Sequence, residues 1–525
     1  MMKNSILGTV CAFLTVALLW GALWIATERL GKTDTDTLTE MTDQGGQDDD
    51  GESVVSKQQQ QVTSEYEEEP EYADLQEEIC TILENGTQSV FAGYAVDEAF
   101  LLWVQKNYGD DAIYSLAEGV TQNSQSEKLW YEVTESSIHV LWMEYCRDTG
   151  LASYQLRNVR WMDCASEDVI TMDFIGDINF GEEWDTMRVL DARGGMLKEC
   201  VSEEILSELS SADIAMANNE FTLSTGGTAI EGKSYVFRAD PLRAKYYKTM
   251  GIDIVSLANN HTWDYGEEAL FDTIETLKQE EISYVGAGMN IEEASIVPYF
   301  IANGRKIAIV SATQIERYRM YTQQAGSNSA GVIKTLEPSL FISIIEETKT
   351  KSDYVIAYVH WGTEGNLYPD EDERTLAQQF IDAGADVVIG GHAHRLQGAS
   401  FIDGKPVLYS LGNFWFSDGD LYTTIAHLTI QKDGALSLSL IPCEQKNLTV
   451  SMLTEQEQRD SFYEYIADLS SGVGITRDGT VHDMSKEQDL TELPDLAYWS
   501  GQKYHRHHGD VDLQGKSIDI VGNVK

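Results

Sequence analysis

The sequence predicts an α/β domain with buried strands, and two patterns within residues 168–450 indicate it. Short apolar runs recur along this segment, among them VITMDFI, IDIVSLA and DYVIAYV. Amphipathic segments with helical spacing separate several of the runs, for example residues 266–282 and 372–385. Apolar strands that alternate with helices are typical of layered α/β proteins, in which both faces of the sheet are covered.

The chain opens with an uncharged apolar segment, residues 5–26, which has about the length that a helix needs to cross a bilayer. Lys3 precedes the segment and Arg29 and Lys32 follow it, so the flanking charges do not fix its orientation. A cleaved signal peptide is the alternative, but no A-x-A-like cleavage site ends the run. We therefore expect a single-pass anchor in the cell membrane, with the main domain extracytoplasmic.

Three further segments flank the α/β domain. Residues 27–74 are polar and acidic, and we expect a disordered linker because they offer too little apolar surface to offset chain entropy. In residues 75–165 apolar residues return with helical spacing, which predicts a small, mainly helical accessory module. Residues 451–525 are acidic and poorly patterned, and we expect a C-terminal tail. Three histidines near its end either bind metal or simply belong to a flexible tail: His505, His507 and His508.

Charge limits the classes of partner. The 86 acidic and 37 basic residues among 525 give a formal net charge of −49 at pH 7, which argues against nucleic acid as a partner. Such a surface attracts cations, so an anionic substrate would need metal ions or local basic residues at its site. The six cysteines match neither a zinc knuckle nor a C-x-x-C pair. We expect structural thiols, with one disulfide left open.

Five of the apolar runs end in residues that can bind metal ions. These residues are Asp177, Asn179, Glu220, Asn260, His360, His392 and His394. Because ligands bind beyond the carboxyl ends of strands in layered α/β folds, side chains far apart in the sequence should converge on one sheet edge. Carboxylate, amide and imidazole donors without thiolates suit manganese, iron or zinc. Two such ions about 4 Å apart could hold an anionic substrate and activate a water molecule.

Each of these residues also has an ordinary structural explanation. Asp177 could be a turn or cap residue after a strand, and Glu220 could be a surface carboxylate. His360 could be a buried histidine with a hydrogen-bond partner, and His392 and His394 could lie in an ordinary loop. Metal binding is predicted because such residues recur at five strand ends in succession.

The same segments carry a family resemblance. In chain order they read GDINFG, NNEFTLS, LANNHTWDYG, YVGAGMN, VHWGTEG, DAGADVVIGGHAHRLQG and VLYSLGNFWFS. These motifs resemble those of the bacterial capsule synthesis protein CapA family, also called the PgsA type of poly-γ-glutamate synthesis protein. The resemblance covers residues 168 to about 442. The family is similar in turn to calcineurin-like metallophosphoesterases, which implies a four-layered α/β/β/α sandwich and a dinuclear metal centre.

The resemblance also implies roles for the individual ligands. Asp177 corresponds to the aspartate of the first motif, and Glu220 stands where the superfamily has its bridging carboxylate. His360 matches the histidine of the fourth motif. His392 and His394 match the G-H-x-H pair, with one histidine for each metal.

Four residues remain. The resemblance makes Asn260 a further ligand and His261 the histidine that donates a proton to the leaving group. Asp264, three positions later, is the second predicted catalytic residue. Asn179 stands where the superfamily has a histidine, so we expect one of the two metal sites to be weaker.

Two functions follow from the resemblance. The first is a membrane-anchored, extracytoplasmic protein of capsule or poly-γ-glutamate biosynthesis or export, with a metal-dependent hydrolase or transferase site. The second is a non-catalytic, metal-binding scaffold of an envelope-polymer assembly complex. Expected partners are the lipid bilayer, an anionic envelope polymer such as poly-γ-glutamate, and membrane synthase subunits.

Overall fold

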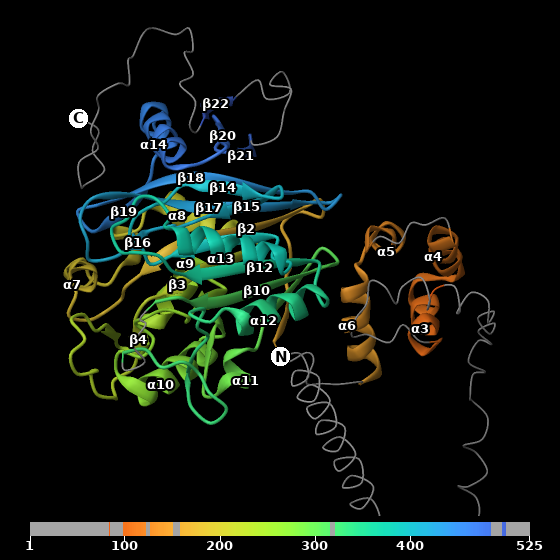
Figure 1. Cartoon of the computed structure of the whole chain (residues 1–525), viewed down its shortest axis with the longest axis horizontal. Coiled ribbons are helices and arrows are strands. Elements are labelled where there is room, and N and C mark those ends of the chain that lie inside the picture. Colours follow the sequence, from red (N-terminus) through yellow and green to blue (C-terminus); the bar gives the residue numbers. More distant parts are fainter. Residues whose placement is uncertain are drawn as a thin grey trace, which may run out of the picture. The chain divides into compact units, whose positions relative to one another are not determined.

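A computed structural model describes Leu83 and residues 98–121, 127–150, 158–315, 321–484 and 496–499 (Figure 1). The expected anchor at residues 5–26, the linker at 27–74 and the histidines of residues 505–508 lie outside these ranges. Among the helices within them, none combines the length and the apolar character required to cross a membrane.

Two sheets form the centre of the α/β domain (Figure 1). Sheet A contains, in spatial order, β1 (Val159–Trp161), β9 (Tyr299–Ala302), β10 (Arg305–Thr313), β12 (Tyr354–His360), β13 (Val387–Gly391), β15 (Lys405–Leu408) and β14 (Ala399–Ile402). Sheet B contains β19 (Thr449–Met452), β18 (Leu436–Lys446), β17 (Leu421–Gln431), β2 (Val169–Ile178), β3 (Ile214–Asn219), β6 (Ile254–Ser256) and β7 (Ser283–Val285), and β16 (Asn413–Trp415) pairs with β2. The run β10-β12-β13-β15 is parallel, and so is the run β2-β3-β6-β7.

The layers follow from the way in which apolar side chains are shared. Phe174 and Met216 of sheet B and Ile309 and Ile356 of sheet A belong to one buried core between the sheets. A second core lies between the outer face of sheet B and the helices α8 (Glu203–Ser211), α9 (Lys245–Met250) and α10 (Gly266–Gln279). A third lies between the outer face of sheet A and the helices α12 (Ser339–Lys349) and α13 (Glu371–Asp382). The layers therefore run helix, sheet, sheet, helix, which confirms the predicted α/β class.

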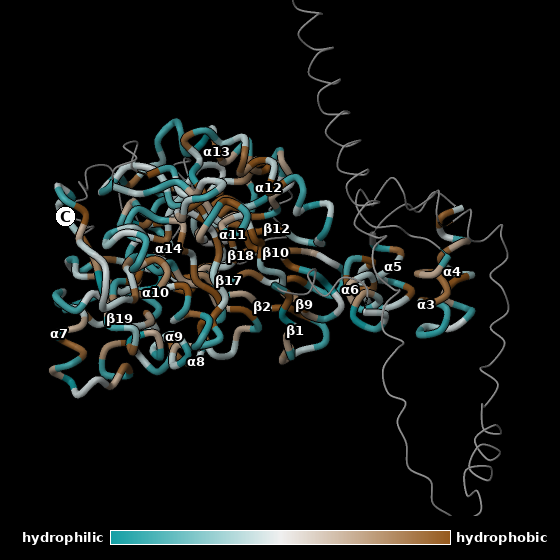
Figure 2. The backbone as a smooth tube through the Cα atoms, turned by 90° about the horizontal axis from the view of Figure 1, so that it is seen from below, coloured by the Kyte–Doolittle hydropathy of each residue, from teal (hydrophilic) through white to brown (hydrophobic). Residues whose placement is uncertain are grey.

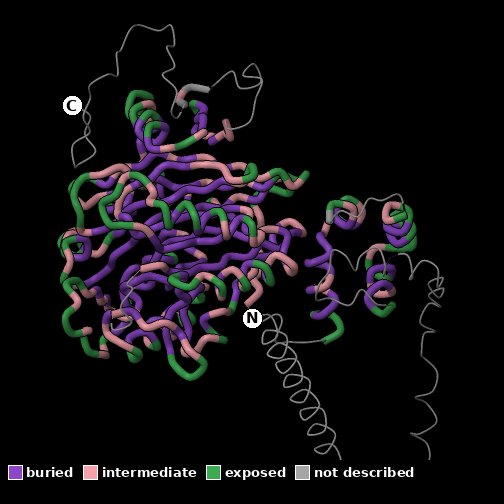
Figure 3. The backbone as a smooth tube through the Cα atoms, viewed as in Figure 1, coloured by how far each residue is buried: buried purple, intermediate pink, exposed green. Residues whose placement is uncertain are grey.

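Burial explains why the central strands are apolar throughout. Every residue of β3, β10 and β13 is buried, because each face of both sheets is covered. Figure 2 shows hydrophobic residues concentrated in the interior of the domain, for example around β10, and Figure 3 shows exposed residues on the surrounding helices and loops. Smaller elements complete the domain: α7 (Asp185–Ala192), β4 (Thr222–Leu223), β5 (Arg238–Ala239), β8 (Ala287–Gly288), α11 (Ile291–Ala294) and β11 (Gly331–Val332).

The segment before the α/β domain forms four helices: α3 (Glu98–Tyr108), α4 (Asp110–Thr121), α5 (Glu127–Thr134) and α6 (Ile138–Thr149). They bury a core of their own that includes Phe100 and Trp130. Ser137 caps α6, because its side chain accepts a hydrogen bond from the amide of Val140. The boundary predicted at residue 165 is displaced, because β1 already belongs to sheet A.

The fold continues beyond the boundary predicted at residue 450. Helix α14 (Gln456–Leu469) buries Phe462 and Ile466 in the core that it shares with both sheets, and β20 (Val473–Thr476) pairs with β21 (Val481–Asp483) and β22 (Leu496–Trp499). Residues 451–484 are therefore part of the domain and not a tail. The acidic residues of α14 occupy its exposed side and obscured the helical spacing of its apolar residues.

The cysteines of the described ranges carry free thiols: Cys146, Cys164, Cys200 and Cys443. The disulfide left open by the sequence does not occur among these four. Cys11 and Cys80 lie outside the described residues.

Candidate metal centre

Strand register brings the predicted ligands of the two sheets together. In sheet B, Asp177 near the end of β2 lies opposite Asn218 on β3 and Asn413 on β16. In sheet A, His360 ends β12 and lies opposite Gly391, the last residue of β13. Because these strands are parallel, their carboxyl ends share one edge, where the side chains that follow them meet.

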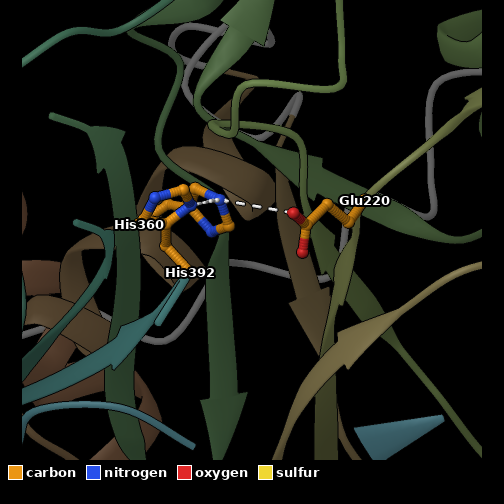
Figure 4. A group of neighbouring side chains, drawn as sticks. All are labelled: Glu220, His360 and His392. Atoms are coloured by element: carbon orange, nitrogen blue, oxygen red, sulfur yellow. Dashed lines mark hydrogen bonds and ion pairs between the residues drawn. The ribbon is translucent and has the colours of Figure 1, made fainter. Parts of the chain in front are cut away.

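Glu220, directly after β3, is at the centre of this group, and its side chain points toward those of His360 and His392 (Figure 4). Its Oε1 atom is fully buried and has no hydrogen-bond partner. The Nε2 atoms of His360, His394 and His261 lie 3.7, 3.8 and 3.9 Å from this oxygen. Two ligands of one transition-metal ion, each about 2.1 Å from it, are separated by roughly 3–4 Å. The spacing therefore fits a shared cation better than direct hydrogen bonds.

The directions of the pKa shifts of the two histidines agree with this interpretation. Burial, and next the charge of Asp177, raises the pKa of Glu220 well above its usual value. Burial, followed by the influence of neighbouring histidines, lowers the pKa of His360 and of His392 well below the usual value. Neutral imidazoles form no ion pair with Glu220, but they present the lone pairs that a metal ion needs.

Asp177 is the second carboxylate of the centre. Its Oδ1 accepts a hydrogen bond from the amide of Asn218 at 2.7 Å, and its Oδ2 accepts one from the backbone N–H of His392 at 3.2 Å. The Nδ1 atom of His394 lies 3.6 Å from Oδ2 and 2.7 Å from Oδ1 of Asn413. Burial raises the pKa of Asp177, and the charge of His394 and these hydrogen bonds oppose the rise.

The donor atoms fall into two groups that share Glu220. One group joins it to His360 and His392, and the other joins it to Asp177 and His394; within each, the donor atoms lie within 4.8 Å of one another. Asn260 extends the first group, because its Oδ1 lies 2.8 Å from Nε2 of His360. These residues therefore offer a divalent cation two adjacent positions.

The predicted catalytic pair lies beside this centre. Nδ1 of His261 is 2.7 Å from Oδ2 of Asp264, which also accepts the backbone N–H of Phe237 at 2.6 Å. Lys233 lies 2.8 Å from the other oxygen of Asp264. Burial lowers the pKa of His261 to about 4, although Asp264 opposes the shift. The neutral imidazole therefore donates a hydrogen bond from its Nδ1–H to Asp264, and its Nε2 faces Glu220.

Asn179 is buried next to the centre, but its oxygen already has a partner. Its Oδ1 accepts the backbone N–H of Gly181 at 2.7 Å, while its Nδ2 has no hydrogen-bond partner. The side chain thus closes the turn that follows β2. Its role as a metal ligand stays a prediction.

A comparison with known proteins identifies the family of the α/β domain. Residues 171–418 match the family model described as "Bacterial capsule synthesis protein PGA_cap". The α/β domain belongs to this family. The predicted family is thereby confirmed.

Two curated relatives also resemble the chain in sequence. The PGA biosynthesis protein CapA of Bacillus subtilis is 28% identical over 284 residues, which cover 53% of this chain and 72% of the relative. The capsule biosynthesis protein CapA of Bacillus anthracis is 27% identical over 321 residues, which cover 58% of this chain and 74% of the relative.

Two solved structures show only a weak likeness to the chain. A hypothetical protein from Thermus thermophilus is 16% identical with a TM-score of 0.33, and the match covers 52% of this chain and 99% of that one. The 5'-nucleotidase of Candida albicans is 14% identical with a TM-score of 0.31, and the match covers 55% of this chain and 53% of that one.

The backbone of the PGA_cap domain is constrained where the last two histidines enter the site. His392 and His394 both have left-handed φ angles, 84° and 54°, which are costly for residues with a Cβ atom. Gly391 must lack a side chain, because a Cβ atom there would lie 2.9 Å from Oδ1 of Asp177. The close approach of carboxylate and backbone thus depends on the glycine of the sequence GGHAH.

Sequence reasoning missed four residues of the site. Asn218 and Asn413 contact Asp177 and His394 directly, and both occur within family motifs, NNEF and GNFWFS, that were noticed without assigning these positions a role. The exposed Glu364 has a carboxylate near His392 and His394. Lys233 lies in a polar loop whose sequence carries no signal of its contact with Asp264.

Proposed function

We propose that this protein takes part in capsule or poly-γ-glutamate biosynthesis or export, and that its strand-end site is a metal-dependent hydrolase or transferase. Membership of the PGA_cap family and the names of the two CapA relatives support the process. The observation that carries the chemistry is the buried, unpartnered Oε1 of Glu220, which has Nε2 of the predicted ligands His360 and His394 3.7 and 3.8 Å away and Nε2 of the predicted acid His261 at 3.9 Å.

The residues of the site fit a divalent cation. Glu220 and Asp177 supply carboxylate oxygens, and His360, His392 and His394 supply imidazole nitrogens. This mixed O/N set without thiolate suits manganese, iron or zinc in a catalytic site. When bound, such an ion polarises a substrate oxygen and lowers the pKa of water.

The side chains of the domain provide the remaining steps. Asp264 holds the Nδ1 proton of His261, so Nε2 is the atom that takes up a proton and passes it to the leaving group. Lys233 balances the charge of Asp264 and also donates a hydrogen bond to the backbone oxygen of Asn260. It therefore ties the predicted acid to a predicted metal ligand. The length and uncharged character of segment 5–26 support a membrane anchor, and the proposal places this domain outside the cytoplasm.

Turnover by the full chain tests the proposal. The protein is stripped with a chelator, reloaded with Mn²⁺, and incubated with a chromogenic phosphodiester and, separately, with poly-γ-glutamate. We expect hydrolysis that Asp177→Asn abolishes and that Asp185→Asn, at an exposed position, retains. Absence of turnover on both substrates by fully loaded protein would overturn the catalytic proposal.

A second candidate function is the non-catalytic scaffold, and Asn179 favours it. Its oxygen already accepts the N–H of Gly181, and an amide stands where the superfamily has a histidine, so one of the two metal positions lacks the expected imidazole. The test is a strain that carries His392→Ala and His394→Ala together. Retained polymer display would favour scaffolding, and loss of polymer despite normal protein levels would favour catalysis.

A further inference from the structure

A second cluster of metal-binding side chains lies on the outer face of sheet B. It consists of Asp173 in the middle of β2, His427 on β17 and Glu208 on α8, which packs against that face (Figure 1). Asp173 and His427 are direct register partners, so their side chains project from the same face. Asp173 precedes Asp177 by four residues, about 13 Å along a strand, so the cluster is separate from the strand-end centre.

Its geometry approaches that of a three-ligand site. Nδ1 of His427 lies 2.7 Å from Oδ1 of Asp173 and 3.8 Å from Oε1 of Glu208. One donor atom of each residue lies within 4.8 Å of the other two. Two ligands about 2.1 Å from one ion lie roughly 3–4 Å apart, so an ion bound here would take the place of the hydrogen bond between His427 and Asp173.

The hydrogen bonding of Asp173 is incomplete. The side chain is fully buried, and its Oδ2 has no hydrogen-bond partner. A buried carboxylate oxygen without a partner is costly, and burial accordingly raises the pKa of Asp173. An apolar sheet face gives no reason to place this oxygen there, whereas a cation would use it.

The charges and the solvent exposure of the three side chains also favour a cation. Within the described ranges, neither Asp173 nor Glu208 forms an ion pair with a lysine or arginine, so two carboxylates share a single imidazole. The side chains of His427 and Glu208 remain 21% and 32% exposed. Two of the three ligands are therefore accessible from solvent.

We propose that Asp173, Glu208 and His427 form a second divalent-metal site of the zinc type, independent of the strand-end centre. Two carboxylates and one imidazole form a donor set for Zn²⁺, with water completing the coordination. Because the ligands come from β2, β17 and α8, the ion would tie the helical layer to the sheet and stabilise the folded state.

Zinc binding by the full chain tests this site. The stripped protein is dialysed against buffered Zn²⁺, bound zinc is counted by mass spectrometry, and affinity is measured against a chromophoric chelator. Background variant Glu220→Gln removes the carboxylate that both groups of the strand-end centre share, so that the second site is observed largely alone. In this background, Glu208→Gln or His427→Gln should remove one zinc ion and weaken binding at least about 100-fold, since losing even an outer-shell partner costs 10–100-fold.

Glu203→Gln is the matched control, because Glu203 is an exposed glutamate of the same helix. It should leave zinc binding unchanged. Glu208→Gln conserves volume at a half-buried position, and circular dichroism verifies its fold; His427→Gln provides a second route to the same answer. If both variants bind as much zinc as the control with the same affinity, the cluster is only a hydrogen-bonded His–Asp pair and the proposal is wrong.

Discussion

Replacing Glu220 by glutamine gives the sharpest test of the strand-end centre. The substitution keeps the shape of the side chain but removes the charge of the carboxylate that lies 3.7–3.9 Å from three imidazole nitrogens. In the presence of EDTA we expect the free energy of unfolding of the variant to lie within about 1 kcal/mol of that of the wild type, because an uncharged amide of equal volume fits the buried position.

With a divalent cation the two proteins should separate. At a metal concentration 100 times the dissociation constant, the wild type gains about 2.7 kcal/mol of unfolding free energy. If the loss of the shared anionic ligand weakens binding about 100-fold, the variant at that concentration gains only about 0.4 kcal/mol. The difference in metal-induced stabilisation is therefore about 2.3 kcal/mol.

The measurement is urea unfolding of the full chain, followed by circular dichroism, with EDTA and with Mn²⁺. Glu267→Gln, at an exposed position of α10, controls for the general effect of removing one negative charge. Equal metal-induced stabilisation in Glu220→Gln and the wild type would refute the assignment of Glu220 as the shared ligand.

Three further predictions concern single residues. Asp264→Asn removes the charge that orients the neighbouring imidazole, so kcat on the phosphodiester should fall about 10²–10⁴-fold with metal content unchanged; an unaltered kcat would contradict this role. Gly391→Ala places a Cβ atom 2.9 Å from the Asp177 carboxylate and should lower the unfolding free energy by about 1–3 kcal/mol, whereas Gly419→Ala, with open space around it, should have no effect in the same urea titration. Burial raises the pKa of Glu373 to about 8. The protonated side chain therefore contributes stability that is fully present below the pKa of glutamate in the unfolded chain and is lost as the pH rises through about 8. Glu373→Gln should therefore gain about 2–4 kcal/mol relative to the wild type between pH 5 and pH 8, and parallel pH profiles of the two proteins would contradict the shift.

The sequence by itself determined the class of fold and most of the strand-end residues. Strands such as DYVIAYV can be recognised from the sequence, because a strand that is buried on both faces has apolar residues at nearly every position. The polar residues that interrupt this pattern at the strand ends, His360 after DYVIAYV and His392 after DVVIGG, were therefore conspicuous. Local pattern was enough, because each of these positions is defined by the strand that it ends.

Only the tertiary structure decided how these residues interact. The register of β2 with β3 and β16 places Asn218 and Asn413 beside Asp177, and no local pattern encodes such a pairing. Long-range packing likewise brings Lys233 to Asp264. It also packs apolar side chains of α14, which composition alone assigned to an acidic tail, into the core that the two sheets share. The sequence specifies which side chains lie at the strand ends, but the register of strands and the packing of loops determine which atoms meet, because these depend on contacts between residues far apart in the chain.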